Sequence, residues 1–281
     1  MPSVPLPRHA CCLLVLLLAA ASPRALAHDF WISAHRAADA PGAVVHMWVG
    51  HHLEAEEGRA YDAASTRRLL LLTPDGTRNL GFGARDGSRP YRRLAPELTP
   101  PALVVLDRNP VDIALDSAKF DSYLAEELLD DIVARRRGAD KEGRERYTRH
   151  IKLLVGNDTG DLHARRLGQP LEIVLLDPPG QPAKGRRLRA QVLFHGKPLA
   201  GRTVTIVSDP DARFDNHNAR ARTAVTDAEG TVSFDYDRAG FWLLRLVHMQ
   251  PCTTDCGDAD WRSWWAAYAM QPDWLPAPAM P

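Results

Sequence analysis

Three groups of histidines offer the most direct chemistry in this sequence. They are His28, in the run His28-Asp29-Phe30-Trp31; the pair His51-His52, which follows Gly50; and His248, at the end of an apolar run. Neutral imidazole nitrogens are good ligands for Ni(II), Co(II), Cu(II) and Zn(II). These four histidines are therefore the candidate metal ligands.

His28 gains a second donor atom if the chain is cut just before it. Arg8 precedes an apolar stretch over residues 10–21, and Ala25-Leu26-Ala27 has the small residues of a signal-peptidase site. Residues 1–27 are thus predicted to be a cleaved secretory signal, which exports the mature chain to an oxidising space; a cut after Ala21 is the alternative. Cleavage after Ala27 would give His28 a free α-amine beside its ring, and both nitrogens are partly neutral near pH 7. Any residue can follow a signal peptide, however, so the position alone does not establish a site.

The other histidines each have a structural alternative. Adjacent strand residues point to opposite faces, so one of His51 and His52 is expected to reach a given metal unless the strand has already ended. The alternative is a pair of exposed loop histidines. His248 shares a strand face with Leu244 and Leu246, and is either a core histidine or a ligand at a domain junction.

A lone bidentate terminus would hold metal weakly, because it offers only two ligands. We therefore predict that His28 is the central ligand, supported by at least one of His51, His52 and His248. Protons compete for imidazoles, so binding is expected to weaken below about pH 6.5.

Composition and motifs exclude several other functions. The 35 Lys and Arg residues balance the 35 Asp and Glu residues, so no basic surface for nucleic acid is expected. The sequence has no Gly-rich phosphate loop, no His-Glu-x-x-His and no Gly-x-Ser-x-Gly. No nucleophile and base can be paired, and no membrane span is expected in the mature chain. The chain is therefore predicted not to be an enzyme.

The elements that would position the histidines are mainly β. Alternating or β-branched runs predict strands over 43–49, 68–73, 102–106, 111–115, 171–176, 187–194, 203–208, 222–226, 231–236 and 241–249. Between these two groups, helical spacing predicts one helix from Asp116-Ser117 to Gly138. A weaker helical pattern over 147–155 ends at Gly156, with its basic residues read as a solvated face. The chain thus divides into a β-sandwich module (28–116), a helical insertion (117–168) and a second β-sandwich module (169–281).

The C-terminal region carries two further features. Cys252 and Cys256 lie in a turn-rich segment of an exported chain, which predicts a local disulfide; a two-Cys metal site is the alternative. The aromatic run that includes Trp261, Trp264 and Trp265 is predicted to pack in the core, although such rings can also stack on sugars.

A specific combination of short segments extends over nearly the whole mature chain. They are Ala27–Trp31, Val49–His52, Lys119–Leu124, Arg144–Tyr147, Gly168–Val174, Gly196–Gly201, Thr226–Gly230, Leu246–Met249 and Asp260–Trp265. In these segments the chain resembles a family of periplasmic proteins of unknown function, often described as NikK-like, that is associated with nickel or cobalt uptake. The resemblance implies two immunoglobulin-like or transthyretin-like β modules joined by a helical insertion, no enzymatic activity, and metal positions at His28, His51, His52 and His248.

The leading hypothesis is an accessory protein that captures nickel or cobalt in the periplasm and passes it to a membrane transporter. Copper handling is an alternative, because an N-terminal histidine on a β-sandwich also resembles periplasmic copper carriers and copper-dependent oxygenases; zinc is a further possible metal. A different class is a metal-free adhesion or envelope-scaffold protein that binds a partner through its tryptophan-rich C-terminal part. Metal titration of the processed chain separates these hypotheses.

Overall fold

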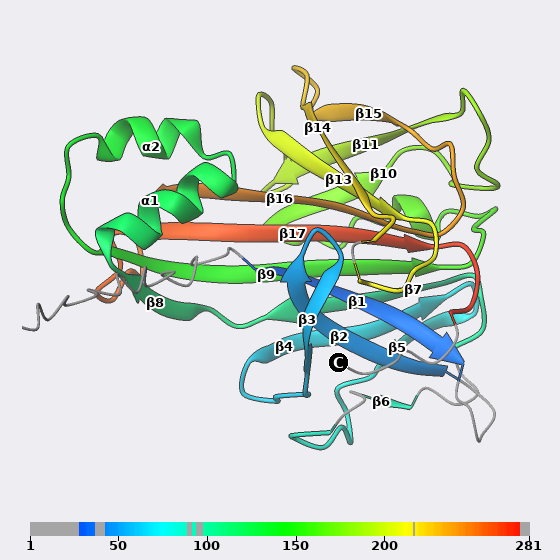
Figure 1. The fold of residues 1–281 in the computed structure, drawn as a ribbon. Helices are drawn as coiled ribbons and strands as arrows, with labels where there is room; N and C mark the ends of the chain where they lie inside the picture. The colour runs from blue at the N-terminus through cyan, green and yellow to red at the C-terminus, as the bar shows by residue number, and fades with distance from the viewer. Residues whose placement is uncertain (1–27, 37–42, 89–91, 94–97, 216, 276–281) are drawn as a thin grey trace, which may run out of the picture.

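In the part of the chain that the structure describes, three β-sheets stack in layers. The computed structural model (Figure 1) describes residues 28–36, 43–88, 92–93, 98–215 and 217–275, and the predicted signal over 1–27 lies outside them. The front sheet contains β1 (Asp29–Arg36), β2 (Ala43–His51), β3 (Glu54–Arg59) and β6 (Arg92–Arg93). The back sheet contains β10 (Leu171–Leu175), β11 (Arg187–Phe194), β12 (Lys197–Pro198) and β15 (Thr231–Asp235).

The central sheet is built from both halves of the chain. Its order is β14 (Arg220–Val225), β13 (Thr203–Asp209), β16 (Phe241–Pro251), β17 (Trp261–Gln271), β9 (Gly143–Val155), β7 (Ala102–Arg108), β4 (Thr66–Thr73) and β5 (Gly76–Asn79), with β8 (Val111–Leu115) paired to β9. The β9–β17 pair is parallel, and it joins the strands of the two halves.

Strand periodicity explains the three layers. Successive side chains of a strand point to opposite faces. Along β7, Val104 and Leu106 join the core beneath the front sheet, whereas Leu103 and Val105 join the core beneath the back sheet. The central sheet is therefore apolar on both faces, and the prediction of a mainly β, sandwich-like fold is confirmed.

The helices α1 (Ser117–Glu126) and α2 (Asp130–Arg136) lie beside the front sheet, on the same face of the central sheet (Figure 1). The side chain of Asp116 caps α1 by accepting a hydrogen bond from the Lys119 amide at 2.9 Å. The single helix predicted up to Gly138 is interrupted, because Leu128 has φ +56°. This break ends α1 at Glu126 and Glu127, above the β2–β3 turn.

The helix predicted over 147–155 is wrong, because these residues form most of strand β9. Tyr147, Ile151, Leu154 and Val155 have helical spacing, but the residues between them are buried in a sheet with layers on both faces. Lys152 is 1% exposed in this sheet and does not face solvent. Hydrophobic periodicity fails here since a strand covered on both faces has no polar side to reveal its period.

The C-terminal predictions are confirmed. The aromatic run forms β17, and Trp264 and Tyr268 are buried in the core beneath the back sheet. Cys252 and Cys256 form a disulfide with 5.7 Å between their Cα atoms, in the connection from β16 to β17. Among the described helices, none combines the length and apolar character needed to cross a membrane.

Candidate functional site

A group of polar side chains fills the junction between the front sheet and helix α1. Asp29 begins β1, His51 ends β2 and His52 follows it in the turn, Glu126 ends α1 and Glu127 caps it, and Arg245 projects from the middle of β16. These residues are called the junction cluster below. Four elements of the chain therefore meet here.

The β2–β3 turn that carries the two histidines has a strained backbone. His52 and Leu53 have φ +47° and +66°, the pattern of a type I′ turn that Asn and Gly favour. A bulge precedes the turn at Val49 and Gly50, where a Cβ on Gly50 would lie 1.7 Å from the Glu54 carbonyl oxygen. Non-glycine residues in this region cost about 1–3 kcal/mol each, and such strain persists where the surrounding structure enforces it.

The turn holds the two imidazoles together and above Asp29. The ring centroids of His51 and His52 are 3.9 Å apart, and the His52 amide donates to Asp29 Oδ2 at 2.9 Å. Burial, and then the proximity of His51, lower the pKa of His52 to about 4. His52 is therefore a neutral imidazole at pH 7, which is the form that binds metal.

Carboxyl groups surround the imidazoles. Asp29 Oδ1 lies 2.5 Å from Arg245 Nε, and Arg245 also donates from Nη1 to Glu127 Oε2. Glu126 Oε1 lies 3.3 Å from His51 Nδ1. Burial raises the pKa of Glu127 to about 7, although the charge of Arg245 opposes the shift. The C-terminal end of a helix carries partial negative charge, so these acids add to a region that favours a cation.

The junction cluster leaves several buried atoms without a hydrogen-bond partner among the described residues. The clearest case is Glu127 Oε1, which accepts no hydrogen bond from a described residue. Asp29 Oδ1 and Arg245 Nε form an ion pair with each other, and His51 Nδ1 has its contact with Glu126, but none of these three atoms has a partner of hydrogen-bond geometry in the described part of the chain. Buried polar groups in folded proteins are normally paired, and an unpaired one calls for an explanation such as an ion or a water molecule.

His28 lies next to this cluster, and its ring points elsewhere. Asp29 pairs with Gly50 in the last pair of the β1–β2 ladder, and His28 and His51 are the residues next to this pair. Its Nε2 lies 2.9 Å from Glu56 Oε2, its carbonyl accepts from Arg149 Nη2 at 3.2 Å, and its side chain is 40% exposed. The structure thus brings His28 to the same corner as His51 and His52.

The structure does not bring His248 to this corner. His248 follows Val247 on β16 and points to the opposite face, where its ring centroid lies 4.5 Å from that of Phe194 in the back sheet. It is 2% exposed, and burial is the main cause that lowers its pKa to about 4. Strand alternation separates His248 from the other three histidines by the thickness of the central sheet.

No three His, Cys, Asp or Glu side chains in the described part of the chain are arranged to hold a metal ion together. The junction cluster offers two adjacent imidazoles, and further ligands would have to come from the chain terminus or from rotation of nearby acids. The sequence did not identify Asp29, Glu126, Glu127 and Arg245 as candidate site residues. A signal existed for Arg245, because it is the lone charge within the apolar run Phe241–His248.

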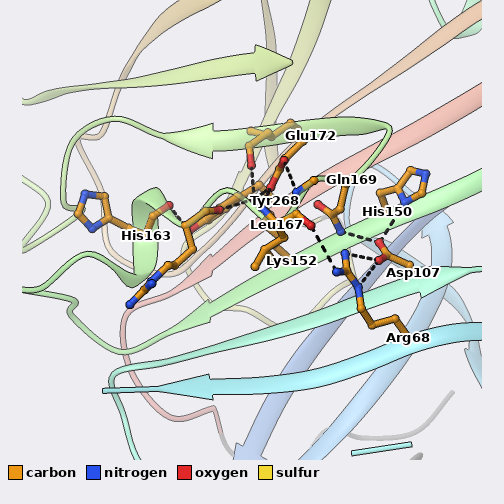
Figure 2. Close-up of polar contacts among 12 residues, drawn as sticks. Arg68, Asp107, His150, Lys152, His163, Leu167, Gln169, Glu172 and Tyr268 are labelled. Atoms are coloured by element: carbon orange, nitrogen blue, oxygen red, sulfur yellow. Dashed lines mark hydrogen bonds and ion pairs between the residues drawn. The ribbon is translucent and has the colours of Figure 1, made fainter. Parts of the chain in front are cut away.

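A second buried polar cluster lies on the opposite face of the central sheet (Figure 2). Lys152 Nζ donates to Glu172 Oε1 at 2.7 Å and to the carbonyls of Arg165 and Ile173. Glu172 also accepts from the amides of Leu167 and Gly168. This second cluster, called the Lys152 cluster, also includes Asp107, which accepts from Arg68, His150 and Gln169.

A wide cleft adjoins the junction cluster on the side of His28. Its volume is about 860 Å³, and its lining includes His28, Phe30, Arg108, Glu145 and Arg149. Sequence analysis did not detect it, because its walls come from β1, β2, β3, β7, β8, β9, β17 and α1 and meet only in the folded chain.

Comparisons with known proteins add a family and little else. A family model described as "Domain of unknown function (DUF4198)" matches residues 25–250. No curated protein matches the sequence. Among solved structures, trypsin-activated alpha-2-macroglobulin from Escherichia coli aligns at 11% identity and a TM-score of 0.19, over 87% of this chain and 16% of that chain. This chain spans less than a fifth of that protein, and a likeness at this TM-score carries no argument.

Proposed function

This chain belongs to the DUF4198 family, which is defined by a domain of unknown function, and from that premise we propose that it binds a transition-metal ion in the periplasm. The metal is nickel or cobalt, and the protein acts as an accessory to uptake by delivering the ion to a membrane transporter. The ligands are the α-amine and ring of His28, after cleavage of residues 1–27, together with His51 or His52. The choice of metal and the transporter come from the resemblance to NikK-like proteins.

The observation that supports the proposal is the register of β1 and β2, whose last pair is Asp29 with Gly50. His28 and His51 are the next residue on each side, and residues directly opposite each other in an antiparallel pair have Cα atoms about 4.5–5.5 Å apart. If the register extended by one residue, the α-amine released by cleavage would lie beside both imidazoles. A rotation of the His28 ring away from Glu56 would bring a further nitrogen to the same corner.

The electrostatics of the junction cluster support a cation. Three carboxyl groups, from Asp29, Glu126 and Glu127, meet one guanidinium, from Arg245, at the C-terminal end of α1. Because the pKa of His52 is about 4, protons do not compete for this ligand near pH 6. The α-amine has an ordinary pKa of about 8, so its protonation would weaken metal binding as the pH falls below about 8.

The proposal is tested by calorimetric titration of nickel, cobalt, copper and zinc into chain whose N-terminus at His28 has been verified by intact mass. One added alanine before His28 should weaken binding as much as His28→Ala does, since either change removes a ligand nitrogen. At least one of His51→Ala and His52→Ala should weaken binding, by about tenfold or more, and the variant that does so identifies the ligand. His248→Ala is the matched control, a buried histidine on the other face, and should leave affinity unchanged.

Other outcomes would redirect the assignment. Tight, selective copper binding would favour the alternative of periplasmic copper handling. If the extended chain and the His51 and His52 variants bind all four metals like the parent, the proposed site is rejected, and a metal-free adhesion or scaffold role becomes the better hypothesis.

A further inference from the structure

The cleft beside His28 has the size and the walls of a small-molecule site. Its volume of about 860 Å³ lies within the range of about 300–1,000 Å³ that is typical of ligand pockets. Apolar and aromatic side chains form much of the wall, among them Phe30, Val111, Ile113, Tyr147 and Trp265. Such a surface suits a ligand with a carbon skeleton.

Two arginines line the cleft without forming an ion pair to any described acid. Arg108 donates to the Ser65 hydroxyl and stacks over Phe30 at 5.3 Å from the ring centroid. Arg149 lies over three rings, those of Phe30, Tyr147 and Trp265, at 5.0–5.4 Å. Its Nη2 donates to the His28 carbonyl, whereas its Nε is buried and has no partner among the described residues.

The aromatic rings fix the two guanidiniums in place but do not neutralise their charge. Burial, followed by the charge of Arg149, lowers the pKa of Arg108, and burial lowers the pKa of Arg149. Two neighbouring cations in a partly buried cleft repel each other, and an anion would relieve that repulsion. Arginine is suited to this role because its planar fork matches a carboxylate.

The cleft is also lined by acids, namely Glu56, Glu57, Asp62 and Glu145. Among them Glu145 is 1% exposed. Its Oε1 accepts hydrogen bonds from the hydroxyls of Tyr123 and Ser263. Its Oε2 is buried without a partner of hydrogen-bond geometry among the described residues. The indole N–H of Trp265 interacts with this carboxyl group but also lacks a partner of good geometry. A ligand hydroxyl that donates to Oε2 would satisfy this atom.

We propose that this cleft binds a small hydroxycarboxylate, whose carboxylate is held by Arg108 and Arg149 and whose hydroxyl donates to Glu145. The aromatic wall accepts the carbon skeleton. A simple inorganic anion would satisfy the arginines but not Glu145, which repels a ligand that brings only acceptors. The proposal is independent of the proposed metal site, because no metal ligand is required for any of these contacts.

The test uses metal-free protein, prepared by passage over a chelating resin without a soluble chelator, and isothermal titration with malate. Succinate, which lacks the hydroxyl of malate, should bind about tenfold more weakly. Inorganic phosphate is the second comparison, and it should bind more weakly than either. His52→Ala protein, in which the changed residue does not line the cleft, should bind malate like the parent, which separates this result from that of the metal site.

Arg149→Gln and Arg108→Gln should each weaken malate binding by about tenfold or more. Arg262→Gln is the matched control, since Arg262 also stacks on a tryptophan, at 5.4 Å from the Trp264 ring, and does not line the cleft. Far-ultraviolet circular dichroism and thermal melting establish that each variant is folded. If Arg149→Gln fails to fold, Arg108→Gln and the malate–succinate comparison still test whether the cleft binds a hydroxycarboxylate.

Three results would overturn the proposal. The first is no heat of binding for malate at about 10 mM, a concentration well above the micromolar affinities of ordinary small-molecule sites. The second is equal binding of malate, succinate and phosphate, which would indicate general attraction of anions. The third is malate binding that folded Arg108→Gln protein retains in full.

Discussion

The two buried polar clusters lie on opposite faces of one sheet and differ in how completely they are satisfied. In the Lys152 cluster, Lys152 uses all three of its protons, and Glu172 and Asp107 each accept several hydrogen bonds (Figure 2). In the junction cluster, Arg245 serves the carboxyl groups of Asp29 and Glu127. The second oxygen of Glu127, Oε1, has no hydrogen-bond partner among the described residues, and His51 Nδ1 has only its 3.3 Å contact with Glu126.

This difference indicates which cluster serves to stabilise the fold. Burying a charge is costly, and a complete set of hydrogen bonds offsets the cost. The Lys152 cluster meets that condition without any further group, so it serves to fasten the back sheet and its connecting segment to the central sheet. The junction cluster does not meet it, and an incoming cation would supply what the fold leaves out.

Replacing one carboxyl group in each cluster by an amide should give the largest difference in stability between the two clusters. Glu172→Gln leaves Lys152 buried without a counter-charge, so the free energy of unfolding should fall by about 3–5 kcal/mol. Glu127→Gln should cost less than about 1 kcal/mol near pH 8, because Arg245 keeps Asp29 as its partner. Urea unfolding of both variants measures the difference, and similar losses would show that both clusters are structural.

The raised pKa of Glu127 predicts that the stability difference between Glu127→Gln and the parent changes with pH. Its pKa of about 7 exceeds its ordinary value of 4.5, so the folded protein binds this proton more tightly than the unfolded chain does. The resulting stabilisation is complete below pH 4.5 and is lost as the pH rises through 7. The stability of Glu127→Gln relative to the parent should therefore rise by about 2 kcal/mol between about pH 5 and about pH 8.

Three histidines change the free energy of unfolding with pH in the opposite direction to Glu127. Their contributions cancel when Glu127→Gln is compared with the parent. The pKa values of His46, His52 and His248 are lowered to about 4, so their contribution to stability is present above pH 6.5 and is lost as the pH falls toward 4. Both proteins contain them. A relative stability that stays flat from about pH 5 to about pH 8 would contradict the raised pKa of Glu127.

The smallest expected effect concerns the two turns that flank the clusters. His52 and His195 have φ +47° and +48°, and Asn tolerates this region better than His does. His52→Asn and His195→Asn should each raise the free energy of unfolding by about 0.5–1 kcal/mol. Thermal melting measures the gain. Only His52→Asn should weaken nickel binding, and an equal loss in His195→Asn would point to adventitious surface binding.

Much of the fold could be predicted from the sequence, because alternation and turn residues mark strands that have one polar face or clear ends. The strand over 43–49 is an example. The turn residues around Cys252 and Cys256 likewise predicted the disulfide. Strand β9 could not be predicted in this way, since its charged residues Arg149 and Lys152 are held inside the protein and mimic the wet face of a helix.

The candidate site was predictable only in part. His51 and His52 stand out by type, and strand pairing brings His28 beside them. The position of His248 depended on the side of β16 that faces the helices, which the sequence does not state. The acids of α1 were hidden because the break at Leu128, which places Glu126 and Glu127 over the turn, has no Gly or Pro to mark it.

The place of β17 in the central sheet has a consequence for the order of folding. This last described strand supplies side chains to the cores on both faces, and Gln271 exchanges two hydrogen bonds with the backbone of Ala34, 237 residues earlier. Neither core can close until the ribosome has synthesised nearly the whole chain. Such non-local pairing makes folding slow, because the ends of a long loop must meet before the contacts form.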